Sequence, residues 1–150
     1  MDVALQYDPV KRCCDLVFNG RDFALDYTPG SAMLFSILAE RRAANDDVLP
    51  DTVPDYTAPS TFIARRGWCG DFLDALGRLT GSRFWLLRRA KATEETRRSA
   101  EVYFAEALIW LETERNLAVQ ITVRWVKPGV LGILARCGKA SLSLSRALAA

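Results

Sequence analysis

The stretch TEETRRSAEVYFAEALIWLETERNLAVQITVRW, residues 93–125, contains two hydrophobic periodicities in succession, and this change decides the fold. Its first part repeats apolar residues at helical spacing, which is typical of one buried face of an α-helix. Thr93 is the predicted N-cap, and Glu94 and Glu95 place negative charge in the first turn, where the helix dipole favours it. We predict a helix that runs to about Glu114, with an apolar face of Ala100, Tyr103, Phe104, Ala107, Leu108 and Leu111.

From Leu117 to Trp125 apolar and polar residues alternate, which is the period of a half-buried strand. Two more strands are predicted beyond it, separated by turns at Pro128-Gly129 and Gly138-Lys139. Serines occupy every second position of the last strand, so we expect them on a wet face at the sheet edge. These strands predict a C-terminal antiparallel meander.

Shorter elements are predicted upstream of the long helix. Asn19-Gly20 fits the centre of a type I′ turn in an N-terminal β-hairpin, with Leu16, Phe18, Phe23 and Leu25 in its arms. Ser31 is the predicted N-cap of a first helix that is finished by Glu40, Arg41 and Arg42. Further on, the sequence favours a short helical turn within residues 72–79 and another short helix capped by Ser82.

The predicted fold class is therefore α+β, with an N-terminal β-hairpin and two or three helices packed on the C-terminal meander. A single domain over residues 1–150 is expected, since the chain length suits one core. Residues 45–59 are interpreted as a proline-stiffened connector. Their acidic residues lack the central glycine and closing glutamate of a calcium loop, so no metal is expected there. Residues 61–66 are expected to be extended.

Composition excludes several classes of function. The chain has no histidine, which removes Ser-His-Asp catalysis and histidine-containing zinc sites. Its 20 basic and 18 acidic residues are too balanced for a dedicated nucleic-acid binder. The N-terminus does not resemble a signal peptide, and the apolar runs are too short to span a membrane. The cysteines, Cys13, Cys14, Cys69 and Cys137, are expected to be reduced and structural.

No catalytic pattern stands out, so we predict that the protein is not an enzyme and binds no cofactor. The candidate carboxylates, Asp71, Asp74, Glu101 and Glu106, have no spacing that singles out a pair. The enzyme alternative is a small hydrolase that uses Asp71 or Glu106. It would need a cleft that holds both carboxylates about 5–9 Å apart.

Several blocks of the sequence resemble a family of Mu-like phage tail proteins. Residues 65–71, RRGWCGD, are similar to the signature R-R-G-W-W-G-D, and residues 81–87 are similar to G-S-R-L-W-L-L. Residues 103–111 resemble Y-x-x-E-A-L-x-W-L, and residues 36–43 match S-L-F-T-D-R-R-A loosely. The blocks occur in the family's order over about residues 13 to 126. The chain departs from the pattern at Cys69, at Ala39-Glu40 and at residues 114–116.

This resemblance implies a small baseplate-wedge subunit of a contractile tail, distantly similar to wedge proteins of T-even phages and of type VI secretion. The implied role is a scaffold, present in several copies in a sixfold assembly and in contact with other wedge proteins, the hub and the sheath. Its implied location is the virion, after synthesis in the host cytoplasm, with no nucleic acid or membrane as partner. The alternative is a wedge component of a tail-like bacteriocin or secretion machine.

The resemblance and the residue types also suggest an interface, because tryptophan and arginine dominate binding hot spots. The candidate interface residues are Arg65, Arg66, Trp68 and Arg83. The alternative is that this loop is a structural staple, with Arg66 and Asp71 paired inside the subunit. Further residues are assigned to the structural motif, namely Gly67, Gly70, Asp71, Gly81, Trp85 and Trp110.

Overall fold

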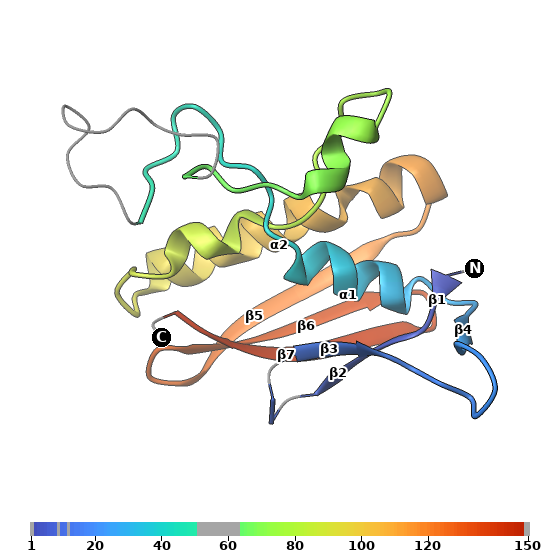
Figure 1. The fold of residues 1–150 in the computed structure, drawn as a ribbon. Coiled ribbons are helices and arrows are strands. Elements are labelled where there is room, and N and C mark those ends of the chain that lie inside the picture. Colours follow the sequence, from blue (N-terminus) through green and yellow to red (C-terminus); the bar gives the residue numbers. More distant parts are fainter. Residues whose placement is uncertain (1, 9, 12, 51–63, 149–150) are drawn as a thin grey trace.

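The computed structural model of the chain describes residues 2–8, 10–11, 13–50 and 64–148. Within this part of the chain, the elements confirm the predicted α+β class. Two α-helices lie on one side of a C-terminal three-stranded antiparallel sheet, and short strand pairs from the N-terminus lie beside it (Figure 1). The organisation as one domain stays a prediction.

The C-terminal meander forms as predicted. It consists of β5 (Val119–Lys127), β6 (Val130–Cys137) and β7 (Ala140–Ala147), with β6 in the centre. The register places Ile133 between Val123 and Leu144, and all three side chains are buried on the face that carries the helices. The alternating serines of β7 are exposed, as the period-2 pattern predicts, because they point to the opposite face.

The long helix α2 (Glu94–Arg115) packs against β5 and also begins where the sequence predicts. The Thr93 hydroxyl accepts a hydrogen bond from the backbone N–H of Thr96 at 3.2 Å, which caps the helix. Asn116 ends it in the left-handed conformation, with φ of 53°. The predicted apolar face is buried except for Tyr103, which is half-buried at the flank.

The helix α1 (Gly30–Leu38) begins by a different device from the one predicted. Ser31 is not its N-cap but lies within the helix, and Pro29 occupies the N-cap position without a side-chain hydrogen bond. The carboxylate of Asp26 accepts hydrogen bonds from the Ser31 backbone N–H at 2.8 Å and from the Ser31 hydroxyl at 2.7 Å. Asp26, five residues upstream, therefore caps the start of the helix in place of Ser31.

The predicted end of α1 at Glu40, Arg41 and Arg42 is also wrong, because the helix ends at Leu38. The chain turns extended at Ala39, whose carbonyl accepts a hydrogen bond from Ser82 N–H at 2.9 Å. Arg41 N–H then donates to the Ser82 carbonyl at 3.1 Å. This pairing with a distant segment forms in place of a further helical turn. It gives hydrogen-bond partners to backbone groups that would otherwise be buried without one.

The N-terminal hairpin exists, but its turn is shifted by one residue. Phe18 and Phe23 pair across it, and Asn19 N–H donates to the Asp22 carbonyl at 3.0 Å, so Gly20 and Arg21 form the centre of the turn. Gly20, at the first central position, has φ of 96°, which suits type II′ rather than the predicted type I′.

The sequence pattern did not predict the other N-terminal pairings. Strand β2 (Leu5–Asp8) pairs with β3 (Cys13–Leu16), and β1 (Asp2–Val3) pairs with β4 (Leu25–Asp26). Each strand is too short to show a periodicity of its own.

The remaining short elements are 3₁₀ helices. The predicted turn within residues 72–79 lies earlier, as η1 (Cys69–Leu73). The helix after Ser82 is η2 (Arg83–Leu87), and Ser82 caps it as predicted by accepting from Phe84 N–H at 3.2 Å. Of the predicted connector, residues 51–59 lie outside the described residues, as do residues 61–63 of the expected extended segment.

The main core lies between the helices and the meander. Met33, Leu34 and Ile37 of α1 meet the buried face of α2 and the inner side chains of β6 and β7. A second, small cluster consists of Ala43, Leu49 and Trp85, of which Trp85 belongs to η2. The 3₁₀ helix η2 contacts α2, and its Phe84 belongs to the main core.

Candidate interaction surface

The loop from Trp68 to Leu79 presents large apolar side chains to solvent. Phe72 is 82% exposed, Leu73 is 75% exposed and Leu76 is 76% exposed. Fully burying one such side chain contributes roughly 1.5–3 kcal/mol of stabilisation. Covering these side chains with another molecule would therefore be favourable. These exposed apolar side chains make the loop the candidate interaction surface. We call residues 68–79 the apolar loop.

Internal contacts hold the base of the apolar loop. The ring of Trp68 packs edge-on against Phe35 of α1, with ring centroids 5.4 Å apart. The same ring lies over Gly70, where an added Cβ would come within 2.2 Å of it, so only glycine leaves room for the indole. Farther along, one carboxylate oxygen of Asp71 accepts a hydrogen bond from Thr80 N–H at 2.9 Å. The Trp68 contact therefore ties the start of the loop to α1, and the Asp71 hydrogen bond closes the loop on itself.

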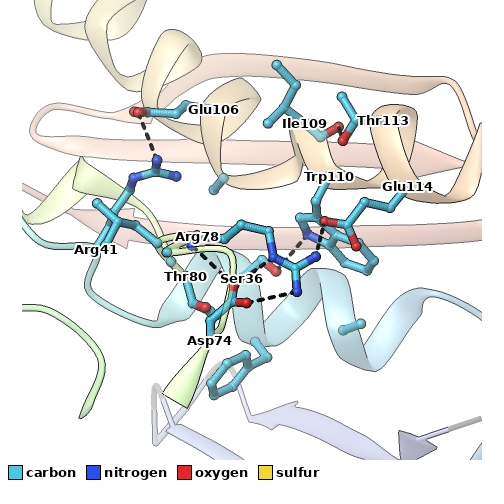
Figure 2. Close-up of a pocket in the computed structure, with 16 residues that line it drawn as sticks. Ser36, Arg41, Asp74, Arg78, Thr80, Glu106, Ile109, Trp110, Thr113 and Glu114 are labelled. Atoms are coloured by element: carbon cyan, nitrogen blue, oxygen red, sulfur yellow. Dashed lines mark hydrogen bonds and ion pairs between the residues drawn. The ribbon is translucent and has the colours of Figure 1, made fainter. Parts of the chain in front are cut away.

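Arg78 ties the far side of the apolar loop to α2. Its guanidinium donates to Asp74 at 2.6 Å and to Glu114 at 2.6 Å, as Figure 2 shows. The hydrogen bond from Arg78 lowers the pKa of Asp74 to about 2, and the two carboxylates raise the pKa of Arg78. Asp74 and Arg78 are therefore both charged at neutral pH, and their ion pair holds this side of the loop.

A cleft of about 580 Å³ lies beneath the apolar loop, between α1, α2 and residues 74–81. Its apolar lining includes Phe35, Leu79, Ile109 and Trp110. The indole N–H of Trp110 donates to the Ser36 hydroxyl at 3.1 Å, which fixes the ring at the cleft wall (Figure 2). The same cleft is also lined by charged side chains, which are Arg41, Asp74, Arg78, Glu106 and Glu114.

Arg83, a predicted interface residue, has its charge satisfied inside the subunit. Its guanidinium pairs with Asp47 at 3.0 Å and with Glu106 at 2.9 Å, and it lies 5.0 Å from the ring centroid of Tyr103. Burial alone would lower the pKa of Arg83, but the two carboxylates raise it. These contacts join the segment after α1, η2 and α2.

Arg65 and Arg66 are also engaged within the chain. Arg65 donates to the backbone carbonyls of Ala44 and Asn45. Arg66 forms an ion pair with Glu40 and lies over the ring of Trp85, 4.6 Å from its centroid. The pairing of Arg66 with Asp71, suggested by the structural alternative, is replaced by these contacts. Of the predicted interface residues, Trp68 alone adjoins the most exposed apolar side chains.

The motif residues hold local geometry. Trp85 is buried, and its indole N–H donates to the Arg41 carbonyl at 2.8 Å. Gly81 has φ of 103° and lies against the backbone of Ala39, and Gly67 lies against Arg42. Sequence reasoning did not single out Phe72, Leu73 and Leu76, which fall within the short helical turn predicted over residues 72–79. The signal available was their density, three large apolar residues within five positions.

The cleft beneath the apolar loop does not hold both carboxylates of the hydrolase alternative. Glu106 lines the cleft together with Asp74 and Glu114, but Asp71 is not part of that lining. Across the described residues, no group of three or more cysteine, aspartate or glutamate side chains is arranged to hold a metal ion. None of the helices in the described ranges combines the length and apolar character required to cross a bilayer.

Comparisons with known proteins identify relatives. Residues 29–143 match the model of a family described as Phage protein GP46. The chain is 39% identical over 110 residues to Baseplate protein gp46 of Escherichia phage Mu, which covers 73% of this chain and 68% of the relative. It is 30% identical over 97 residues to Mu-like prophage FluMu protein gp46 of Haemophilus influenzae, covering 65% of this chain and 57% of the relative. No solved structure matches the chain.

Proposed function

Because the chain belongs to the phage protein GP46 family, we propose that it is a structural, non-enzymatic subunit of a phage-tail baseplate. The carrying observation is the identity of 39% with a protein named for the baseplate of phage Mu, over most of both chains. The subunit belongs to the wedge of a contractile tail, in several copies with sixfold arrangement. Its partners are other wedge proteins and the hub, with the sheath as a further neighbour, and its location is the virion tail.

The surface that makes this contact is the apolar loop with the cleft beneath it. Phe72, Leu73 and Leu76 supply the hydrophobic anchors, and the cleft supplies a concave seat beside them. The ion pairs of Arg78 pre-organise the loop, so little conformational entropy is lost when a partner covers it. Trp68 joins this surface directly, whereas Arg65, Arg66 and Arg83 contact other parts of the subunit and are assigned a structural role.

A double substitution tests this proposal in a phage or prophage that encodes the chain, with its own gene inactivated. Phe72→Asp/Leu76→Asp replaces exposed side chains, so the isolated subunit is expected to keep its circular dichroism spectrum and unfolding midpoint. Infectious particles and the amount of the chain in purified tails are expected to fall by about a hundredfold or more, since two anchors are lost and two charges are desolvated.

The matched control is Val10→Asp/Val48→Asp, which places the same charges at positions 89% and 85% exposed, outside the apolar loop. This variant is expected to support assembly at nearly the wild-type level. Normal particle yield with the loop variant would refute the apolar loop as the contact surface. Absence of the wild-type chain from purified tails would refute the baseplate role itself.

A further inference from the structure

The C-terminal meander is the basic part of the molecule. From Asn116 to the end of β7 the chain carries no aspartate or glutamate, whereas its basic residues there are Arg124, Lys127, Arg136, Lys139 and Arg146. The whole chain has a net charge of only +2, so the rest of the protein is net acidic. Charge segregation of this kind points to a surface that meets an oppositely charged partner.

The face of the meander opposite α1 and α2 carries two of these charges. The register aligns Gln120, Arg136 and Ser141 in one cross-strand row, and Arg124, Gly132 and Ser145 in another. Apart from half-buried Gly132, these residues are exposed. Figure 1 shows the helices on the other side of the sheet, with the N-terminal strands beside β7. We call this surface the open sheet face.

The arginines of the open sheet face have no partner in the described part of the chain. Neither Arg124 nor Arg136 forms an ion pair or a side-chain hydrogen bond there, in contrast to Arg78, Arg83 and Arg97, which each pair with two carboxylates. Their guanidinium groups remain available for bidentate contacts with carboxylates.

The open sheet face is also hollowed. A depression of about 430 Å³ is lined by Tyr7, Arg124, Val126, Gly132, Leu134 and Ser143, among others. It exists because Gly132 lacks a side chain, and an added Cβ there would come within 2.5 Å of Val126. Tyr7 closes one edge, where its hydroxyl donates to the Ser145 carbonyl at 3.5 Å. The surface thus offers a concave seat with cations, hydroxyls and a few apolar groups.

We propose that the open sheet face binds an acidic segment of a second protein in the same assembly. Carboxylates of the segment pair with Arg124 and Arg136, and the serine hydroxyls of β7 form hydrogen bonds with its backbone. Apolar side chains of the segment fill the hollow against Val126 and Leu134. A protein fits better than nucleic acid, because a phosphate backbone draws its affinity from many cationic contacts and this face offers few. The inference rests on the proposed function, which supplies the assembly.

Carbodiimide cross-linking of purified tails tests the proposal, because this reagent joins a lysine amine to a carboxylate that it touches. Lys127 and Lys139 are exposed in or beside the two turns at opposite ends of the meander. We expect mass spectrometry to find them joined to aspartate or glutamate of another tail protein. Lys91, an exposed lysine outside the meander, is the internal control, and we expect its cross-links to that protein to be about tenfold fewer.

A charge-reversal variant of the two arginines provides a second test of the proposal. Arg124→Glu/Arg136→Glu is expected to lower incorporation into tails by about tenfold or more, because it turns attraction into repulsion. Arg98→Glu/Arg115→Glu changes the net charge equally at exposed positions of α2 and is expected to incorporate normally. Both proteins are first checked for the wild-type circular dichroism spectrum. A substitution to glutamine at both sheet positions, with an intermediate loss expected, separates loss of charge from misfolding.

Distinct results overturn the inference without touching the proposed function. A wild-type chain present in tails, with Lys127 and Lys139 no more cross-linked to carboxylates than Lys91, would show that no acidic partner covers this face. Normal incorporation of the charge-reversal variant would do the same. If the purified chain bound a short duplex DNA in a salt-dependent way and the charge reversal abolished this binding, the partner of this face would be nucleic acid and not an acidic protein.

Discussion

At the scale of single residues, Arg83 separates the two roles considered for the arginine-rich motif. It joins Asp47, Glu106 and the ring of Tyr103, which belong to separate parts of the fold. We expect Arg83→Ala to lower the free energy of unfolding by roughly 1–3 kcal/mol, because half-buried carboxylates lose their charged donor. Urea unfolding monitored by tryptophan fluorescence measures this change.

Arg98→Ala is the matched control for this experiment, since Arg98 is largely exposed and its contact with Glu94 is 3.7 Å long. An exposed pair of this kind contributes little, and a change below about 0.5 kcal/mol is expected. If Arg83→Ala left stability unchanged but blocked incorporation into tails, Arg83 would be an interface residue rather than an internal support.

Asp26 gives the chain an acid-sensitive contact. Burial opposes its ionisation, but hydrogen bonds from Ser31 and Thr28 outweigh that effect and hold the pKa of Asp26 well below its ordinary value. A depressed native pKa stabilises the fold above the unfolded pKa of about 3.9, and the contribution is lost as pH falls through the native pKa.

Asp26→Asn is therefore expected to lower stability at neutral pH by about 1 kcal/mol, as for a lost helix cap. The difference from the wild type should shrink as pH falls below about 4, where the wild-type carboxylate begins to lose its advantage. Unfolding midpoints across this pH range measure it. Asp46→Asn, at an exposed position, is the control, and a constant difference between wild type and Asp26→Asn would contradict the assignment.

At the scale of elements, the crossing of the segment after α1 over the start of η2 depends on Gly81. Its φ is 103°, and an added Cβ would approach the Ala39 carbonyl oxygen to 2.5 Å. We expect Gly81→Ala to destabilise the fold by about 2 kcal/mol or more, since backbone strain and a steric clash act together. Thermal unfolding followed by circular dichroism measures the loss.

Gly77→Ala isolates the first of these two effects. Gly77 also has a positive φ, 65°, but nothing lies within 4 Å of an added Cβ. A cost of about 1 kcal/mol from backbone strain alone is expected there. Equal costs at both positions would mean that the close approach of Gly81 to Ala39 does not matter for stability.

The elements that could be predicted from the sequence are those whose hydrophobic periodicity continues over many consecutive residues. The helix from Thr93 and the alternating strands were correct because each shows its pattern over many residues. Prediction failed where distant contacts decide. Helix α1 ends early because Ala39 pairs with Ser82, and Asp26 replaces Ser31 as its cap.

The candidate surface was predicted only in part, for a related reason. Trp68 was found because its motif is distinctive, whereas exposure of Phe72 and Leu76 could not be predicted from residue type. Large apolar side chains are buried in most proteins, and only the tertiary structure shows which of them remain uncovered. The internal partners of Arg66 and Arg83 come from segments far along the chain, so spacing gave no sign of them.

At the scale of the whole molecule, a single domain is expected to unfold in one cooperative step. Trp68, Trp85, Trp110 and Trp125 lie in the apolar loop, η2, α2 and β5, so their fluorescence reports on separate regions. If one cooperative unit exists, urea transitions seen by fluorescence and by far-ultraviolet circular dichroism should coincide. Separate midpoints for the two signals would divide the chain into independently stable parts.

The contact between α1 and β7 has a consequence for how the chain is made. These segments meet although more than 100 positions separate Leu38 from Ala140. During translation α1 leaves the ribosome long before its neighbour in the core has been synthesised. Its apolar side stays uncovered until β7 has been synthesised, whereas the strands of the meander can pair with one another as soon as they emerge from the ribosome. The native core can therefore be completed only after β7 has emerged, and a nascent chain stalled before β7 is a natural client for a chaperone.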